Sequence, residues 1–108
     1  MKRGDFVTIA MQGDFGKPRP ALIIQSDQFD ALATMTLLLV SSDFVEAPLF
    51  RITVKPDNKN GLRKASQIMV DKAMTVRQDK LGAPFGVASD DLMVAVNRAL
   101  AVFLGIAR

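Results

Sequence analysis

Arg19 is the residue whose surroundings most clearly suggest chemistry, because it lies between Pro18 and Pro20. Each proline fixes its own φ and favours extended geometry in the residue before it, so the arginine side chain leaves from a stiff backbone. The apolar residues 21–24 follow and are typical of a strand covered on both faces. A guanidinium at the start of such a strand is well suited to binding a phosphate through paired N–H donors. The alternative is an ordinary salt bridge at a sheet edge.

The residue types that are missing restrict the chemistry further. The chain has no His, which is the commonest general base and metal ligand, and no Cys, so that disulfides and thiolate metal sites are excluded. Any catalysis must therefore use Arg, Lys, carboxylates, hydroxyls or backbone groups. We expect no metal ion and no cofactor.

Length and composition predict one domain spanning residues 1–108, with 49% hydrophobic residues to build its core. The net charge of +3 fits an anionic partner such as RNA, although many ordinary domains are equally basic. The N-terminus shows no signal-peptide pattern, and no apolar run approaches the ~20 residues of a membrane span. We expect a cytoplasmic protein without a membrane segment.

The elements that must position Arg19 are mostly short strands. Alternating or continuous apolar segments predict strands over residues 6–10, 19–25, 34–41 and 50–54. Residues 62–76 are expected to hold two short strands broken near Asp71 and Lys72. Residues 26–33 form a polar connection with at most one helical turn. Turn or loop composition marks residues 11–17, 42–48, 56–61 and 80–86, with Asn60-Gly61 as the strongest turn signal.

The C-terminal part has a different periodicity. Ser89, Asp90 and Asp91 can cap a helix, and Gly105 can end it. Between them an apolar stripe recurs at helical spacing, typical of core or dimer surface: Leu92, Met93, Val96, Leu100, Phe103 and Leu104. The predicted fold is mainly β (α+β), with five to seven short strands followed by one amphipathic helix.

With this order of elements, the sequence resembles the MazF/PemK family, the toxins of bacterial type II toxin–antitoxin pairs. The resemblance is carried by residues 3–7, 16–25 and 66–72, the last running on to residues 79–82. It implies an SH3-like β-barrel with a C-terminal helix, and a homodimer. It also implies metal-independent, sequence-specific cleavage of single-stranded RNA and, as a partner, a small acidic, partly disordered antitoxin that covers the RNA groove.

The resemblance implies Arg19 and Ser41 as the catalytic pair. Ser41 stands where the family usually has Thr, and the adjacent Ser42 takes its place if the alignment shifts by one residue. Lys64 and Ser66 stand where some relatives have Arg and Asp, so they are candidates for catalytic support. The implied reaction is attack by the ribose 2′-OH on its own phosphate, giving a 2′,3′-cyclic phosphate and a 5′-OH. Asp14, Asp43 and Asp71 are candidate proton acceptors, with structural roles as the alternative.

Substrate binding is expected from residues in the loops and the late strand. The candidates for RNA binding are Gln12, Phe15, Lys17, Phe44, Lys55, Lys59, Arg63 and Gln67, with Lys64 as a further cation. Lysines and arginines would neutralise phosphates, and phenylalanines would stack on unpaired bases. The alternatives are a solvated charge for each lysine, packing beneath a loop for each phenylalanine and a hydrogen bond within the sheet for Gln67.

Two other functions fit parts of the sequence. A gyrase poison of the CcdB type shares the barrel and ends its helix in Trp-Gly-Ile, which residues 103–106 echo without the tryptophan. Such chains also lack the Arg-Pro block. The other alternative is a catalytically inactive SH3-like binding module, since fold alone does not define function.

Overall fold

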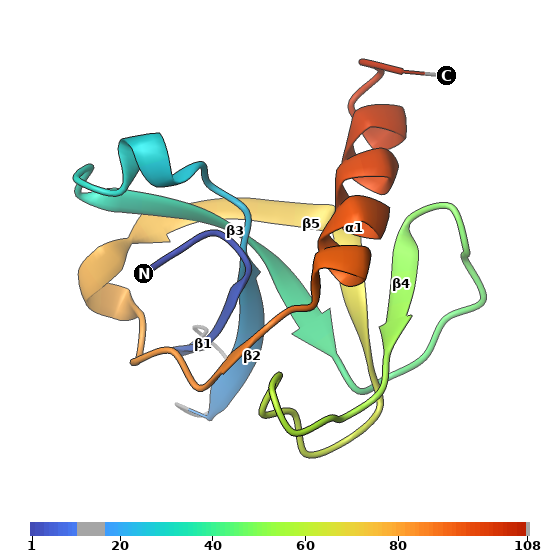
Figure 1. Cartoon of the computed structure of the whole chain (residues 1–108), viewed down its shortest axis with the longest axis horizontal. Coiled ribbons are helices and arrows are strands. Elements are labelled where there is room, and N and C mark those ends of the chain that lie inside the picture. Colours follow the sequence, from blue (N-terminus) through green and yellow to red (C-terminus); the bar gives the residue numbers. More distant parts are fainter. Residues whose placement is uncertain (11–16, 108) are drawn as a thin grey trace.

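Short strands dominate the chain, and a single α-helix follows them in the described residues (Figure 1). The computed structural model describes residues 1–10 and 17–107. The elements are, in order, β1 (Asp5–Ala10), β2 (Pro18–Ile23), the 3-10 turn η1 (Asp27–Phe29), β3 (Thr34–Ser41), β4 (Arg51–Val54), β5 (Ser66–Arg77), η2 (Gln78–Lys80), β6 (Gly86–Val87) and α1 (Asp90–Phe103).

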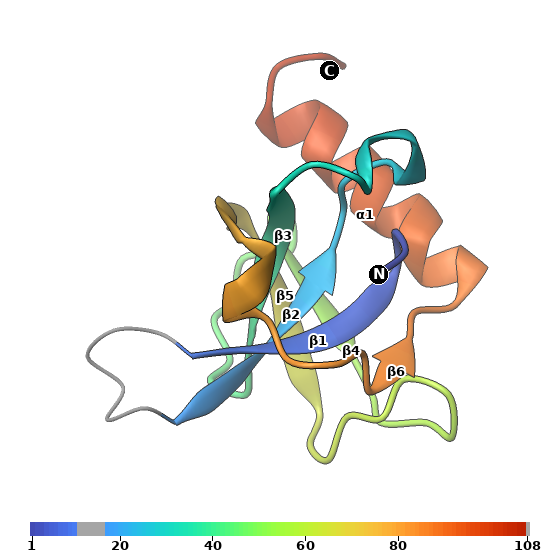
Figure 2. The same ribbon diagram turned by 90° about the vertical axis from the view of Figure 1, so that its left-hand side faces the viewer.

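The strands form one antiparallel sheet in the order β4-β5-β3-β2-β1-β6, and the sheet curls until its two edges approach each other. The backbone N–H of Val87 in β6 donates to the carbonyl of Lys59, which follows β4, at 2.8 Å. Figure 2 shows this meeting of β6 with the segment after β4. The result is a curled half-barrel with a C-terminal helix, which confirms the predicted fold class.

Both faces of the central strands are buried, as the apolar run after Arg19 predicts. Phe6, Leu22 and Leu38 lie opposite one another on β1, β2 and β3 and belong to one core. Val7 and Ala21 alternate with them and belong to a second core on the other face. Because side chains of neighbouring residues in a strand point to opposite faces, a strand between two cores must be apolar throughout.

Helix α1 begins and ends where its capping signals predict. The Ser89 hydroxyl accepts a hydrogen bond from the Leu92 N–H at 3.1 Å, and Gly105 adopts φ +76° after the last turn. Val96 is fully buried against the first core, whereas Phe103 and Leu104, at the end of the stripe, are exposed. No helix in the described part of the chain combines the length and apolar character that crossing a membrane requires.

Two predictions about strands are wrong. Residues 66–77 form one continuous strand, β5, instead of two strands broken near Asp71. The pairing of β5 with β3 does shift in register there. Leu38 pairs with Ala73 and Val40 pairs with Ile68, so a step of two residues on β3 corresponds to a step of five on β5. The extra residues of β5 are absorbed by a bulge, which bends a strand without ending it. The predicted loop 80–86 also ends in the short strand β6, which pairs with β1.

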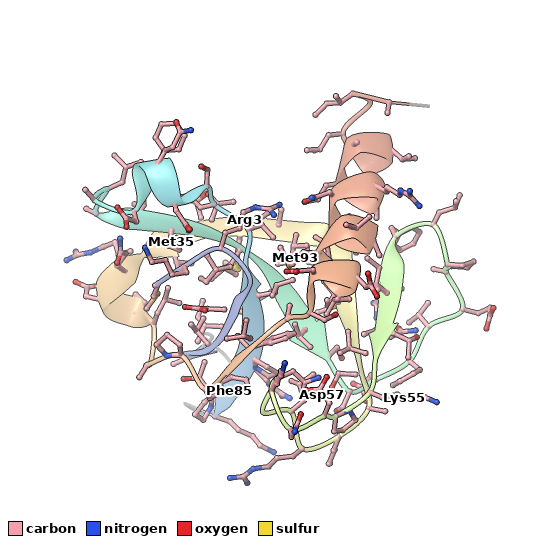
Figure 3. All side chains as sticks on the ribbon, viewed as in Figure 1. Arg3, Met35, Lys55, Asp57, Phe85 and Met93 are labelled. Atoms are coloured by element: carbon pink, nitrogen blue, oxygen red, sulfur yellow. The ribbon has the colours of Figure 1, made fainter. Side chains whose placement is uncertain are left out.

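The N-terminal residues tie the sheet to the helix. Arg3 donates from Nε to the Ile24 carbonyl at 2.8 Å and from a terminal nitrogen to Oδ1 of Asn97 in α1 at 2.6 Å. Figure 3 shows Arg3 beside α1 in the upper half of the view, with Phe85 and Asp57 in the lower half. Within residues 3–7, which carry part of the family resemblance, Arg3 thus has a structural role: it links the sheet to α1.

Candidate active site

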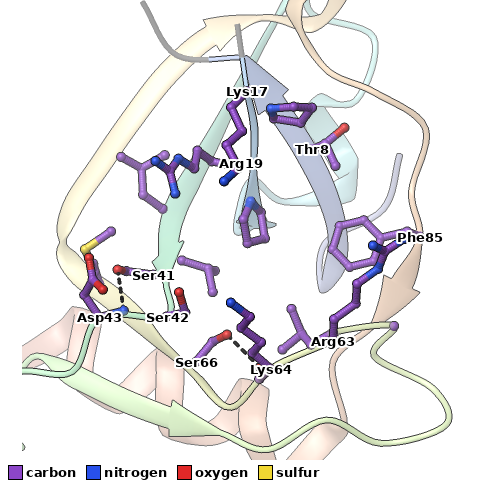
Figure 4. Close-up of a pocket in the computed structure, with 17 residues that line it drawn as sticks. Thr8, Lys17, Arg19, Ser41, Ser42, Asp43, Arg63, Lys64, Ser66 and Phe85 are labelled. Carbon is purple, nitrogen blue, oxygen red and sulfur yellow. Dashed lines mark hydrogen bonds between the residues drawn. The ribbon is translucent and has the colours of Figure 1, made fainter. Parts of the chain in front are cut away.

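A groove of about 840 Å³ opens where β2, the end of β3 and the segment before β5 meet (Figure 4). We call it the basic groove. Its lining brings together cations, hydroxyls and, among the described residues, one carboxylate, that of Asp43. The cations are Lys17, Arg19, Arg63 and Lys64, and the hydroxyl residues are Thr8, Ser41, Ser42 and Ser66. This composition suits an anion whose oxygens can accept several hydrogen bonds.

Arg19 lies in the part of β2 that is paired on one side. Residues Pro18 and Pro20 pair with β1, while the pairing of β2 with β3 begins at Ala21. Proline is tolerated at such a position because it has no N–H to offer to a further strand. Arg19 is exposed and lines the basic groove. The predicted Pro-Arg-Pro platform therefore pairs with β1, precedes the part of β2 that pairs with β3, and lines the groove.

Ser41 and Ser42 enter the groove from the end of β3. Ser41 pairs with Gln67 of β5 and is half-buried, and Ser42 is exposed beyond the strand. The Ser41 Oγ accepts a hydrogen bond from the Asp43 N–H at 3.0 Å. One lone pair of this hydroxyl is thus engaged by the backbone, and its proton is left to donate to a ligand.

Arg63, Lys64 and Ser66 reach the groove from the segment before β5. Ser66 is buried, and its hydroxyl donates to the Lys64 carbonyl at 2.9 Å. The side chains of Arg63 and Lys64 are exposed. Ser66 thereby fixes the backbone that carries Lys64, whereas the two cations face the groove.

The turn that precedes this segment is held by hydrogen bonds of two side chains, those of Asp57 and Asn60. Asn60 is buried; its Oδ1 accepts from the Asp57 and Leu62 N–H groups at 3.2 and 3.0 Å, and its Nδ2 donates to the Lys55 carbonyl at 2.9 Å. The backbone N–H groups of Asn60 and Lys59 donate to the Asp57 carboxylate, and these bonds lower the pKa of Asp57 below its ordinary value of 3.8. The turn therefore holds the start of the Arg63–Lys64 segment in place.

Comparison with known proteins identifies the family. A model described as PemK-like, MazF-like toxin of type II toxin-antitoxin system matches residues 2–104. The chain belongs to this family. The probable endoribonuclease MazF of Mycolicibacterium smegmatis is 45% identical over 108 residues, which cover 99% of each chain.

Solved structures share the fold of this MazF-like chain at lower identity. One is an endoribonuclease in complex with its cognate antitoxin from Mycobacterial species, with a TM-score of 0.84 and 21% identity over 100% of this chain and 98% of that one. Another is the Form-II MazE–MazF structure from Deinococcus radiodurans, with a TM-score of 0.79 and 20% identity over 99% of this chain and 97% of that one.

Several predicted RNA-binding residues of this MazF-like chain lie away from the basic groove. Phe44 and Gln67 line a second hollow of about 440 Å³. Gln67 is buried there; its Oε1 accepts from the Val45 N–H at 3.0 Å and from Arg51 at 3.2 Å, so that it anchors the loop after β3. Lys55 and Lys59 are exposed in the turn and do not line the groove.

The candidate acids are separated by the structure. Asp43 lines the basic groove, whereas Asp71 does not and its carboxylate pairs with Lys72 at 2.6 Å. Gln12, Asp14 and Phe15 lie outside the described residues. Across residues 1–10 and 17–107, no group of three or more His, Cys, Asp or Glu side chains is placed to hold a metal ion.

Thr8 and Phe85 are among the groove-lining residues that sequence reasoning missed. Thr8 lies in β1 opposite Pro20, and Phe85 lies in the loop before β6. Nothing in the local pattern distinguishes Phe85 from a buried loop residue. Its position depends on the chain folding back so that its N–H donates to the Phe6 carbonyl, at 2.9 Å.

Proposed function

We propose that this MazF-like toxin is an endoribonuclease that cuts single-stranded RNA without a metal ion. The observation that carries the proposal is the convergence of Arg19, Ser41 and Lys64 on one basic groove, in a chain 45% identical to a probable endoribonuclease. A phosphodiester offers the anionic oxygens that such donors bind.

The proposed reaction takes its nucleophile from the substrate. The ribose 2′-OH loses its proton to solvent as its oxygen attacks the adjacent phosphorus, and the bond from phosphorus to the 5′ oxygen breaks. The 5′ oxygen takes up a proton from solvent, so the products are a 2′,3′-cyclic phosphate and a 5′-OH. Arg19 binds the non-bridging oxygens, and the Ser41 hydroxyl donates to the same phosphate, so that charge is stabilised as it develops. Lys64 adds positive charge, and Ser42 and Ser66 support the site from either side.

The wider RNA surface includes the other groove cations. Lys17 and Arg63 bind flanking phosphates, in keeping with their exposure along the groove. Contacts of RNA with Gln12, Phe15, Phe44, Lys55, Lys59 and Gln67 stay predictions. Of these six, the four described residues lie outside the groove lining, so we assign them no part in the chemical step.

The decisive experiment is cleavage of a defined single-stranded RNA in EDTA by the purified protein. We expect cuts at a short sequence motif and cyclic-phosphate ends, with Arg19→Ala slower by about a hundredfold or more, the typical cost of removing one preorganised donor. Arg77→Ala is the matched control, because Arg77 pairs with Asp79 and does not line the groove. Full activity in a well-folded Arg19→Ala protein would overturn the catalytic role of Arg19. Cleavage that occurs without EDTA but stops when EDTA is added would overturn the proposed metal independence.

The proposed partners are an antitoxin and a second copy of the chain. One structure similar in fold contains its cognate antitoxin and another pairs MazF with MazE, and an acidic segment would complement the cations of the basic groove. Exposed apolar residues at the end of α1, Phe103, Leu104 and Ile106, supply a surface for a homodimer. Growth arrest on expression, relieved by a small acidic protein, and a dimeric mass by sedimentation are the expected results.

A further inference from the structure

Phe85 is an aromatic residue on the wall of the basic groove to which no role has been given. It lies in the loop between η2 and β6, and 37% of it is exposed. Figure 4 shows it across the groove from Ser41 and Asp43, with the side chain of Arg63 running toward it. The open part of the ring presents an apolar face to the groove, beside its cations, on which the flat part of a ligand can pack.

The other side of the ring is fixed by the core. Phe85 stacks on the fully buried Phe6, with ring centroids 6.2 Å apart and an angle of 30° between the planes. A Cβ on Gly61 would lie 2.8 Å from Cδ1 of Phe85 and 2.3 Å from its carbonyl oxygen, so this glycine makes room for the ring. The ring is therefore a preorganised surface, which loses little conformational freedom when a ligand binds.

The composition of the groove restricts the kind of ligand that fits. The cations Lys17, Arg19, Arg63 and Lys64 favour an anionic ligand, and the face of Phe85 suits a flat apolar group next to that charge. A nucleotide combines both in adjacent positions. Bases in a duplex already stack on their neighbours, so an unpaired base is the one available to an aromatic side chain.

We infer that Phe85 is the stacking platform for one unpaired base of the RNA, and that Arg63 binds the phosphate of the same nucleotide. This rests on the proposed function. It adds a specific base subsite across the groove from the Arg19–Ser41 pair, supplied by a residue that the sequence pattern does not single out. Since stacking tolerates any base, the platform sets the position of the strand more than the sequence that is cut.

The test combines protein variants with base removal. The cut site is first mapped, and the RNA is made uncleavable by a 2′-deoxy sugar at the attacking nucleotide. Each flanking position is then replaced in turn by an abasic residue. We expect Phe85→Leu, which keeps apolar packing on Phe6, to weaken binding of intact RNA about five- to a hundredfold. At one abasic position, the affinity of the wild type should fall by the same factor. For that abasic RNA, wild type and Phe85→Leu should bind with equal affinity.

Two control variants and one measurement on the wild type complete the design. Phe85→Tyr keeps an aromatic face and should bind within about twofold of wild type, and so should Phe29→Leu, because the exposed Phe29 of η1 does not line the groove. If Phe85→Leu melts at a lower temperature than wild type, the platform is tested with wild-type protein instead. The fluorescent base 2-aminopurine is placed at each RNA position in turn, and its quenching on binding is measured. Quenching at one position near the cut supports the platform, and quenching at none overturns it.

The remaining outcomes separate this inference from the function on which it rests. Suppose that wild type cuts RNA but that Phe85→Leu binds intact RNA as tightly as wild type does, or binds every abasic RNA more weakly than wild type does. The platform is then overturned, and the proposed nuclease function stands. If Phe85→Leu weakens only an acidic antitoxin peptide, the base platform is also overturned. If wild type neither binds nor cuts single-stranded RNA, both proposals fall together.

Discussion

The hydroxyl of Ser41 has its hydrogen-bonding direction set by its neighbour. Because the Asp43 N–H occupies one lone pair of Oγ at 3.0 Å, the hydroxyl proton is available to a phosphate oxygen in the groove. Ser42 is exposed one residue beyond the strand, with its side chain in the same groove. Both serines therefore line the same groove, but only the Ser41 hydroxyl is oriented by a backbone hydrogen bond that the structure shows.

This difference predicts unequal effects of removing the two hydroxyls. Ser41→Ala should lower single-turnover cleavage about a hundredfold or more, since a fixed donor to developing charge is lost. Ser42→Ala should stay within about tenfold, and Ser41→Thr should retain most of the rate because it keeps the hydroxyl. Rates measured on the same RNA, with melting curves as the fold control, check this. A larger loss in Ser42→Ala would assign the role to the neighbouring residue.

At the level of residues, the structure brings together those predicted side chains whose position depends on the local backbone, while their roles stay predictions. Arg19 between its prolines, Ser41 at a strand end and Arg63–Lys64 after the Asn60-Gly61 turn do meet in one groove. Phe44 and Gln67 face the second hollow, and Phe85 was missed. Their positions depend on how loops distant in sequence pack on one another, which local patterns do not encode.

At the level of elements, the turn over residues 56–61 couples the edge of the sheet to the groove. Gly61 has φ +68°, and its missing side chain leaves room for the Phe85 carbonyl and ring. Gly105 has a similar φ of +76°, but a Cβ there would meet nothing within 4 Å. Both glycines therefore have a positive φ, but only at Gly61 would an added Cβ collide with neighbouring atoms.

These two glycines form a matched pair for measuring the tight packing of the turn. Gly105→Ala should cost about 1–2 kcal/mol of unfolding free energy, the usual strain of a left-handed alanine. Gly61→Ala adds a clash with backbone atoms and should cost about 3 kcal/mol or more. Urea denaturation of both variants gives the comparison. Equal losses would show that the turn can move away from Phe85, which would weaken the case for a rigid groove wall.

The Asp57 carboxylate makes the stability of the same turn depend on pH. Its pKa is lower in the folded protein, chiefly because the Asn60 N–H donates to it, so its contribution is present above its ordinary pKa of 3.8. That contribution is lost as the pH falls through the lower folded value. Asp57→Ala should therefore melt at a lower temperature than wild type at neutral pH, and the gap should narrow below pH 3.8. A gap that is constant down to acid pH would contradict this account.

Strand β5 shows what sequence patterns miss among the elements. The polar pair Asp71-Lys72 interrupts an apolar run, which predicts a break, yet the strand continues because β4 and β3 pair with its first half and β3 pairs with its second. The bulge against Leu38–Val40 accommodates the extra residues. Helix α1 was predictable because its cap, stripe and terminal glycine are all local signals.

Across the whole molecule, the net charge of +3 understates the positive charge of one face. The basic groove gathers Lys17, Arg19, Arg63 and Lys64 beside one carboxylate, that of Asp43, in the part of the chain that the structure describes. Outside it, Lys72 and Arg77 are paired with Asp71 and Asp79. A basic face of this kind attracts a polyanion more strongly than the net charge suggests.

The number of groove cations sets the expected salt dependence of RNA binding. Each neutralised phosphate of a single strand contributes a slope of about −0.7 to log K against log salt, so contacts from four cations give about −2 to −3. Binding of an uncleavable RNA, measured from about 50 to about 200 mM KCl, should show this slope. Lys64→Gln should bring it closer to zero by about 0.7. Lys80→Gln, at an exposed lysine of η2 outside the groove lining, should leave it unchanged. A slope that Lys64→Gln and Lys80→Gln alter equally would mean that the whole surface attracts RNA and that the groove holds no defined set of phosphates.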